Sequence, residues 1–447
     1  MHEIFGALDL KQSPISITGK GDLPSRFCVT DLAVSSQHCV ASAMTELMTV
    51  LSLTKAPTPI TLNRRLASLW FSFTYQPIGW DMPSSWDEIA GDYKTHDGWI
   101  KLHTNLPHHK AAALSVLKVE NNRDEVARVV SQWGGEDLET AIVDAGGVCA
   151  KMRSRTEWSS HPQGKAVAKE PLIHWDNQIH TSLREWQPTR ERPLQGLKVL
   201  DLTRVLAGPV ATRALAGFGA QVLRIDPENW DENIVVPEVT LGKQCAYLDL
   251  KKPEGLERFE QLLGDADILI HGYRPGALDG MCLGKAKRQA INPGLIEISL
   301  DAYGWSGPWA TRRGFDSLVQ MSCGIAQAGM VWANAEKPTP LPVQALDFAT
   351  GYIMAASAIR SLTMALKGER KAHARLSLAR TAELLIAHPQ EQKGEMSLTL
   401  EDHEFKSGIE KTPWGDLRRL NVPFEIKGTP MHWDSPACKF GSAKAHW

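Results

Sequence analysis

Asp316 is the residue with the clearest potential for chemistry in this chain of 447 residues. In the segment 312–326, apolar and small residues recur at helical spacing and place Asp316 where a helix begins. Aspartate is a preferred N-cap, worth about 1 kcal/mol, so a purely structural role would explain it. The position also suits a catalytic carboxylate, because helix amides and the helix dipole keep it ionised at neutral pH, and an ionised aspartate is a usable nucleophile. The residue pattern leaves both roles open.

A dinucleotide site is the first alternative that the sequence suggests. A strand, a turn with glycine, a helix and an acid at the end of the second strand have the general shape of such a site, with Asp226 as the ribose partner. The turn Ala207-Gly-Pro209 nevertheless lacks the Gly-x-Gly-x-x-Gly fingerprint, and Pro209 offers no amide to a phosphate. We therefore disfavour NAD binding and expect Asp226 to be a solvated acid at a strand end.

Metal and serine chemistry are also disfavoured. His103, His108 and His109 have no carboxylate or cysteine at ligand spacing, and adjacent histidines rarely point the same way, so we expect surface or packing histidines and no metal. The Gly-x-Ser-x-Gly elbow of serine hydrolases is absent, and Ser306 lacks the strand-to-helix context that such an elbow requires.

The region after residue 190 has the pattern of an α/β domain. Predicted strands are 198–202, 221–225, 245–250, 267–271 and 295–300, and predicted helices include 210–218 and 254–263. Strands and helices that alternate with short loops indicate a doubly wound, Rossmann-like parallel sheet. Ligands of such sheets bind at the carboxyl ends of the strands, where this chain has the Gly/Pro loops 203–209, 272–277 and 301–308. These three loops are predicted to form one surface.

The region before residue 190 is less regular. The polar stretch 176–196, with Pro188 and Pro193, has no helical or strand period and indicates a linker, so we place a domain boundary near 190. A helix at 39–51, a turn and strand at 97–103, and helices at 124–133 and 138–145 predict a smaller α+β domain over 1–190. The large domain then covers 191–447, with a wrapping tail over 391–447.

Six segments of the large domain occur in a characteristic order. They are the segments 193–209, 219–225, 248–255, Tyr273-Arg-Pro-Gly-Ala277, Tyr303-Gly-Trp-Ser-Gly-Pro308 and Gly314-Phe-Asp-Ser-Leu-Val-Gln320. Together they closely resemble the class III (formyl-CoA transferase-like) CoA-transferase family. The resemblance covers about residues 190–385 and ends in 375–380, which is similar to the family's strand after its long helix.

The resemblance implies an enzyme that moves CoA from an acyl-CoA thioester to a carboxylic acid. The family's nucleophilic aspartate falls on Asp316, which would attack the thioester, form a mixed anhydride and then carry CoA as an aspartyl-CoA thioester. The exchange between near-isoenergetic thioesters needs no ATP. The family's fold is a doubly wound sheet that binds CoA at the strand ends, usually within an interlocked homodimer.

CoA contacts also carry over from the family. They fall on Val205, Leu206 and Ala207 after the first strand, Lys243 before the third, Gly272, Tyr273, Arg274, Gly276 and Ala277 after the fourth, and Tyr303. The chain departs from the family at two places. His271-Gly272 replaces a common Glu-Asn pair, and Asp301 stands where some transferases have a CoA-contacting lysine.

Two rival functions remain open. A related branch racemises 2-methylacyl-CoA esters with a His/Asp proton-transfer pair; its histidine aligns with Phe315, which cannot move a proton, and its acid aligns with Asp347. The second rival is a non-catalytic CoA-binding or assembly subunit. The segments 97–102 and 155–164 resemble the family's small domain, which here precedes the nucleotide-binding half instead of following it, as in a permuted or truncated-fusion version.

Composition limits partners and location. Lys+Arg 49 against Asp+Glu 51 gives a formal charge of −2, which lacks the basic footprint of a nucleic-acid-binding protein, so we expect anionic CoA to be held locally by Lys243, Arg274 and strand-end amides. The seven cysteines include no Cys-x-x-Cys pair, which favours a reducing cytoplasm. No basic leader and no apolar run of roughly 18 residues occurs, so we expect an unexported protein without a membrane segment.

Overall fold

A seven-stranded sheet organises the computed structural model, which describes residues 1–447 except 178–182, 233, 370 and 392–393. The strand order is β10 (Lys243–Tyr247), β9 (Gln221–Asp226), β8 (Lys198–Leu202), β11 (Ile268–His271), β12 (Ile296–Asp301), β13 (Lys371–Ser377) and β7 (His174–Asn177). The first six strands are parallel, and β7 pairs antiparallel with β13. The predicted α/β class is confirmed. Residues 178–182 of the predicted linker and 392–393 of the predicted tail lie outside the described residues.

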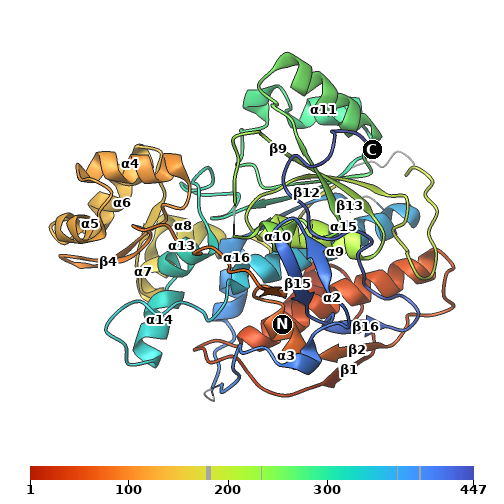
Figure 1. Cartoon of the computed structure of the whole chain (residues 1–447), viewed down its shortest axis with the longest axis horizontal. Coiled ribbons are helices and arrows are strands. Elements are labelled where there is room, and N and C mark those ends of the chain that lie inside the picture. The colour runs from red at the N-terminus through yellow and green to blue at the C-terminus, as the bar shows by residue number, and fades with distance from the viewer. Residues whose placement is uncertain (178–182, 233, 370, 392–393) are drawn as a thin grey trace.

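Both faces of this sheet are buried, which explains the nearly continuous apolar strands. Val199 and Ile268 belong to one hydrophobic core, whereas their neighbours Leu200 and Leu269 belong to another. The first core is covered by α2 (Val29–Val50), α9 (Ala207–Gly217) and α15 (Ala345–Leu366), and the second by α11 (Pro253–Asp265) with α12 (Lys285–Ile291) beside it. Figure 1 shows α11 on the side of the sheet opposite α15 and α2.

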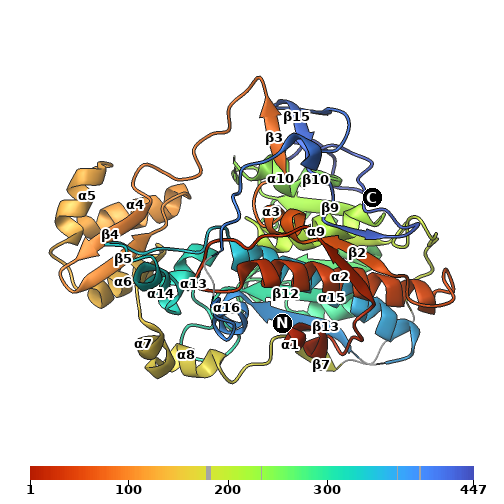
Figure 2. The ribbon, with the colours of Figure 1, turned by 90° about the horizontal axis from the view of Figure 1, so that it is seen from below.

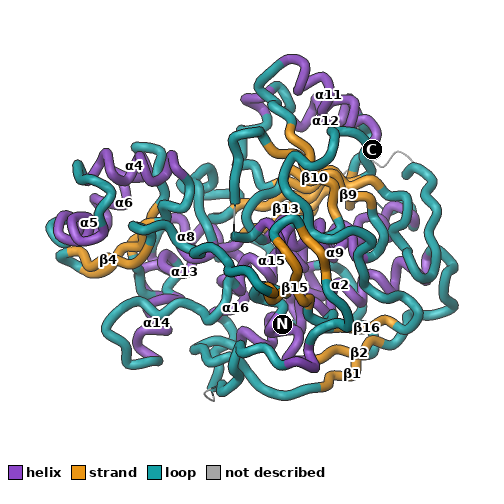
Figure 3. The backbone as a smooth tube through the Cα atoms, viewed as in Figure 1, coloured by secondary structure: helices purple, strands orange, loops and turns teal. Residues whose placement is uncertain are grey.

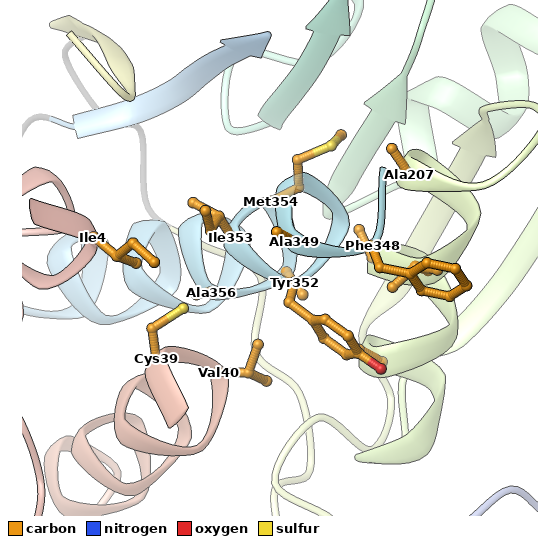
Figure 4. Packing of buried hydrophobic residues seen from close by; sticks show 14 of the residues in the cluster. Ile4, Cys39, Val40, Ala207, Phe348, Ala349, Tyr352, Ile353, Met354 and Ala356 are labelled. Carbon is orange, nitrogen blue, oxygen red and sulfur yellow. The ribbon is translucent and has the colours of Figure 1, made fainter. Parts of the chain in front are cut away.

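Helix α15 lies at the centre of the larger core. It is apolar on nearly all sides, as expected for a helix that packs against a sheet and two further helices. Figure 4 shows α15, with its residues Ile353 and Phe348, beside α2, which carries Cys39 and Val40, and the start of α9, which carries Ala207. Gly351 permits the closest approach, because an added Cβ would lie 2.3 Å from the backbone oxygen of Ala207. The core therefore fixes the start of α9 relative to α15.

Segments from the two ends of the chain pair with each other. One small sheet joins β1 (Ile15–Thr18), β2 (Ile60–Asn63) and β16 (Phe424–Ile426), and a second joins β14 (Glu410–Thr412), β15 (Gly415–Arg419) and β3 (Tyr75–Ile78). The predicted helix at 39–51 largely coincides with the second half of α2, which packs in the core of the large sheet. The division of the chain at residue 190 stays a prediction.

A compact module lies to one side of the large sheet (Figure 2). It contains β4 (Gly91–Thr95), β5 (Gly98–Leu102), β6 (Cys149–Lys151), α4 (Pro107–Leu117), α5 (Arg123–Val130) and α6 (Gly135–Asp144), around a core of its own. The predicted helices at 124–133 and 138–145 overlap α5 and α6. Val148 and Ala150 pack against Leu318 and Met321 of α13 (Asp316–Ser322), so the module is seated directly on the helix of the predicted nucleophile.

The remaining elements are short (Figure 3). They are α1 (His2–Ala7), α3 (Arg64–Leu69), α7 (Arg155–Ser160), α8 (Pro162–Val167), α10 (Val236–Val239), α14 (Ile325–Trp332), α16 (Leu378–Ile386) and the 3₁₀ turns η1 (Asp279–Met281) and η2 (Asp402–Glu404). Within the described ranges, no helix combines the length and the apolar character that crossing a bilayer requires.

Candidate active site

A cavity of about 670 Å³ opens at the carboxyl ends of β8, β11 and β12. Its volume lies in the range of small-molecule and cofactor sites, and its position is where open α/β sheets bind ligands. The loops that follow these three strands all contribute to its walls, as the sequence predicted. A further wall comes from α4 of the compact module and from the residues that lead into α13.

Seven of the ten predicted CoA contacts line this cavity. They are Val205, Ala207, Gly272, Tyr273, Arg274, Gly276 and Ala277. Leu206, Lys243 and Tyr303 are buried outside its lining. The structure therefore brings the strand-end loops together and leaves three of the ten residues in supporting positions.

The loop after β8 has an unusual backbone at Val205. This residue has a φ of 64°, in the left-handed region that a β-branched side chain rarely adopts. Its amide donates a hydrogen bond of 2.7 Å to Glu232 Oε1, which holds the loop in place. Such strain costs on the order of 1–3 kcal/mol and tends to occur at functional sites. Val205 and Ala207 thus line the cavity from a turn that the hydrogen bond to Glu232 holds in a strained conformation.

Lys243 is part of a buried polar network beneath this loop. Its Nζ donates to Asp201 Oδ2 at 3.0 Å, to Thr212 Oγ1 at 2.6 Å and to the Pro209 carbonyl at 3.0 Å. Asp201 also accepts from the amide and the hydroxyl of Thr203. The ammonium is fully buried and has these oxygen partners, so its contacts support the β8–α9 turn from below rather than facing the cavity.

Tyr303 and Asp301 follow β12 and take different positions. The Tyr303 ring is buried, and its hydroxyl lies 3.1 Å from Ser322 Oγ in α13. Asp301 lines the cavity; its Oδ1 accepts from the Gly304 amide, and burial raises its pKa well above the usual range. Burial therefore opposes a negative charge on Asp301.

Asp316 lies one residue inside the helix, which corrects the expectation of an N-cap. Phe315 occupies the cap position of α13 and makes no side-chain cap hydrogen bond. The Asp316 carboxylate instead accepts from Gln320 Nε2 at 2.5 Å and from the Asp347 amide at 2.9 Å, with the Leu346 amide also contributing. These two amides open α15, whose cap residue Gln344 gives no side-chain bond. Asp316 thus caps a helix other than its own.

The two aspartates form a buried acidic pair. Burial raises the pKa of Asp316 to about 6, although its hydrogen bonds with Gln320 and the α15 amides oppose the shift. Burial, followed by the nearby Asp316 charge, raises the pKa of Asp347 well above its ordinary value. Burial therefore outweighs the hydrogen bonds that were expected to keep Asp316 ionised, and a charge on either carboxyl group opposes a charge on the other.

Only one of these carboxyl groups is in the cavity wall. Asp347 and Phe315 line the cavity, whereas Asp316 is 1% exposed and lies behind them. The predicted nucleophile is thus adjacent to the cavity without facing it. From the sequence, Asp347 was expected to act only as the acid of a racemase. Nothing in the residue pattern indicated that Asp347 would be more accessible than Asp316.

Basic side chains surround the rest of the cavity. They are Arg204, Lys251, Arg274, Arg312 and Arg313. Arg204 lies over Trp230 with its guanidinium carbon 4.2 Å from the ring centroid, and it lies 3.5 Å from Asp226. Sequence reasoning identified only Arg274 among them. Arg204 stands in the predicted first loop, and Arg312 and Arg313 directly precede the α13 segment, so their place in the sequence is consistent with a position at the cavity.

The compact module contributes histidines to the wall. His108 and His109 of α4 both line the cavity, and His103 stacks on Phe315 with ring centroids 4.0 Å apart. The expectation of surface or packing histidines is correct for His103. It did not include the position of His108 and His109 in the cavity wall. Among the described residues, no group of three or more metal-ligating side chains is present. Asp226 is also buried against Arg224 at 2.8 Å, so the expectation of a solvated acid is wrong.

Comparison with known proteins gives a partial match. Residues 194–408 match the model of CoA-transferase family III. An acetyl-coenzyme A transferase nodX of Hypoxylon pulicicidum is 33% identical over 166 residues, which are 36% of this chain and 28% of that protein. A succinyl-CoA:glutarate CoA-transferase of Homo sapiens is 32% identical over 173 residues, 36% of this chain and 39% of that protein.

A crystal structure of Rv3272 from Mycobacterium tuberculosis is also similar. It has 29% sequence identity and a TM-score of 0.41, over 45% of this chain and 57% of that chain. The chain spans less than half the length of the two curated relatives named above.

Proposed function

Residues 194–408 belong to CoA-transferase family III, and we propose on that premise that the protein transfers CoA from an acyl-CoA thioester to a carboxylic acid. The observation that carries the proposal is the cavity at the strand ends, which combines basic side chains with a carboxyl group. The basic residues suit the phosphates of CoA, because cations in a partly enclosed cleft raise the local concentration of anions. The curated relatives, named as CoA-transferases, support the same activity.

We infer that Asp347 is the carboxylate that meets the thioester. The family resemblance assigns the nucleophile to Asp316, and that assignment remains a prediction. The position of Asp347 in the cavity wall favours it for attack, because a nucleophile must approach the carbonyl carbon closely. Asp347 attacks in its ionised form. Asp316 accepts a hydrogen bond from the amide of Asp347, and its charge, after burial, opposes that ionisation.

The transfer divides into balanced steps. An aspartate oxygen attacks the thioester carbonyl carbon, the C–S bond breaks, and CoA leaves as a thiolate with an acyl-aspartyl anhydride on the enzyme. The thiolate attacks the aspartyl carbonyl carbon and releases the donor acid as a carboxylate. The acceptor carboxylate attacks the resulting aspartyl-CoA thioester, and the thiolate returns to the acceptor carbonyl. The product thioester leaves, and the aspartate is restored as a carboxylate.

The described residues have defined tasks in this scheme. Arg204, Lys251 and Arg274 bind the anionic part of CoA, and the backbone of the Val205 turn lies against the ligand. The N-terminus of α15 stabilises the negative charge of the ionised Asp347 carboxylate, because this residue stands in the first turn of a 22-residue helix. Phe315 covers the acidic pair and excludes water from the anhydride and thioester intermediates.

Finer features of the fold are proposed with the function. Counted from β8, the parallel strands have the order 3-2-1-4-5-6, which supports a doubly wound, Rossmann-like domain whose order reverses at β8, beside the cavity. On the resemblance alone we propose a homodimer, interlocked as in the family. The free cysteines of the described chain agree with the proposed cytoplasmic location.

A racemase is the second candidate, because Asp347 faces the cavity and His109 of the module lines the same space. Such a pair would exchange the α-proton of a 2-methylacyl-CoA with solvent. Incubation in deuterated water with NMR or mass detection tests this candidate, and a thioester without incorporated deuterium removes it. A non-catalytic CoA-binding homologue would show neither exchange nor transfer.

Trapping of the covalent intermediate tests the proposal. The protein is mixed with an acyl-CoA without acceptor, digested, and searched by mass spectrometry for a peptide that carries CoA on an aspartate. A thioester on Asp347 supports the transferase with Asp347 as nucleophile, and one on Asp316 supports the transferase with the assignment from the resemblance. A protein that acquires no CoA and transfers none contradicts the proposed function.

A further inference from the structure

His109 is a buried polar residue whose side chain has no hydrogen-bond partner among the described residues. It lies in α4, is 2% exposed, and lines the cavity. Neither Nδ1 nor Nε2 makes a hydrogen bond with any of the described residues. Buried polar groups are normally hydrogen-bonded, and each exception calls for an explanation such as a ligand or a catalytic role.

The surroundings of His109 keep its imidazole neutral. Phe315 meets it edge to face with ring centroids 6.0 Å apart, and His108 packs against it at 4.1 Å. Desolvation, followed by the charges of neighbouring basic groups, lowers the pKa of His109 to about 3. A neutral imidazole has one N–H donor and one acceptor nitrogen, so it can donate to an oxygen without carrying a charge itself.

The position of His109 connects it to the acidic pair. Phe315 contacts the ring of His109 and directly precedes Asp316 in the sequence. Asp316 in turn accepts a hydrogen bond of 2.9 Å from the Asp347 amide. His109 and Asp347 line the same cavity from different parts of the chain. The cations Arg204 and Lys251, by contrast, follow the strands β8 and β10 of the large sheet.

We propose that the N–H of His109 donates a hydrogen bond to the thioester carbonyl oxygen of the bound acyl-CoA. This inference rests on the proposed function, since it needs an acyl-CoA thioester bound in the cavity. As the carbonyl carbon is attacked, negative charge develops on its oxygen, and a fixed donor in a water-poor site stabilises that charge. No covalent bond to His109 forms, and its proton stays on the ring throughout.

A binding comparison isolates the carbonyl contact. The two probes are butyryl-CoA and S-butyl-CoA, which differ only in that a CH₂ group replaces the carbonyl. Their dissociation constants are measured by calorimetry with a protein that carries both Asp316→Asn and Asp347→Asn, so that neither carboxyl group can react. We expect this protein to bind butyryl-CoA roughly tenfold more tightly, and the same protein with His109→Phe added to bind both probes equally. The inference is overturned if the preference persists after His109→Phe or is absent before His109 is changed.

Kinetics supply the second readout. In the otherwise unchanged protein, His109→Phe should lower kcat by about 10²- to 10³-fold with a smaller change in KM, since the contact strengthens as charge develops. His109→Gln and His109→Asn retain an N–H donor and should recover part of the loss. Equal loss in all three variants would assign His109 to packing alone and overturn the inference.

A control separates this contact from the general effect of removing a buried imidazole. His38 is buried in α2, and its Nε2 lies 3.1 Å from the Ser13 carbonyl. His38→Phe should lower the melting temperature without altering the preference for butyryl-CoA. Failure of the proposed function is distinct, because it appears as an unmutated protein that neither transfers CoA nor acquires it covalently, whatever the result for His109.

Discussion

Replacement of Asp316 by asparagine would distinguish the two roles open to this residue. If Asp347 attacks the thioester, Asp316 is a negative neighbour that, after burial, raises the pKa of the nucleophile. Asp316→Asn removes that charge and keeps an oxygen that can accept from the Asp347 amide. The nucleophile must be ionised, so activity rises with pH through its pKa. A lower pKa therefore moves the acidic limb of the pH–rate profile to lower pH.

The size of this shift follows from the contact between the two residues. Asp316 Oδ2 lies 2.9 Å from the Asp347 amide nitrogen, which places the two carboxyl groups within roughly 6 Å of each other. At an effective dielectric constant of about 20, two charges at this distance interact by about 3 kcal/mol, equivalent to about two pKa units. Solvent relaxation reduces this value, so we expect the limb to move by roughly one to two pH units.

The assay is kcat/KM for CoA transfer from pH 4 to 9, for the unmutated protein and for Asp316→Asn. The variant loses the Gln320 hydrogen bond, because its amide would meet another donor while Gln320 Oε1 already accepts from the Leu341 amide. That loss should cost about 1 kcal/mol of stability, measured by urea unfolding. Asp347→Asn is the matched comparison and should lower transfer by about 10³-fold, or about 4 kcal/mol.

Two results would refute this reasoning. A fall of about 10³-fold in Asp316→Asn with near-normal rates in Asp347→Asn would make Asp316 the nucleophile, as the family resemblance predicts. An unchanged acidic limb in an active Asp316→Asn protein would show that the two carboxyl groups are not electrostatically coupled.

Further predictions concern stability, binding and pH. Lys243→Met should lower the free energy of unfolding by about 3–5 kcal/mol in urea titrations, because Asp201 is left as an unpaired buried charge, and a purely kinetic effect would contradict its supporting role. Gly351→Ala should destabilise the fold by about 1–3 kcal/mol in thermal melts, since the new methyl group would meet the Ala207 carbonyl. Lys251→Ala should weaken CoA binding by about 3- to 10-fold at low salt and less at high salt, and a salt-independent loss would exclude a phosphate contact. Because the pKa of Asp316 is raised in the folded protein, the contribution of this group to stability is present below the unfolded pKa and is lost as the pH rises to about 6. The free energy of unfolding of Asp316→Asn, measured in urea, should therefore rise relative to that of the unmutated protein as the pH increases from 4 to 6.

Local patterns in the sequence predicted most of the large sheet. Strands such as β8, β9 and β11 are short apolar runs bounded by turns, and their burial on both faces explains why these runs are so uniform. Their order in the chain also places the following loops at one edge, so the cavity position was predictable. Of the ten contacts predicted from the family motifs, seven line this cavity.

The features that sequence reasoning missed depend on pairing between distant segments. The strands near the chain ends, such as β3 with β15, have no short-range signal that specifies their partner. The family motif predicts Lys243 as a ligand contact. Its hydrogen-bond partner Asp201, 42 residues away in the sequence, holds it beneath the loop that follows β8. Asp316 has the local pattern of a cap, and only the packing of α13 against α15 shows which helix it caps.

The walls of the cavity come from two parts of the chain with separate interiors. The strand-end loops that line the cavity belong to the region 194–408, whereas Leu106, His108 and His109 belong to the compact module, which has its own hydrophobic core and lies before that region. Evolution can therefore vary the two walls independently, and so can an engineer. Exchange of residues 89–151 as a block, with Val148 and Ala150 retained for their contact with α13, would combine a new wall on the module side of the cavity with unchanged strand-end loops.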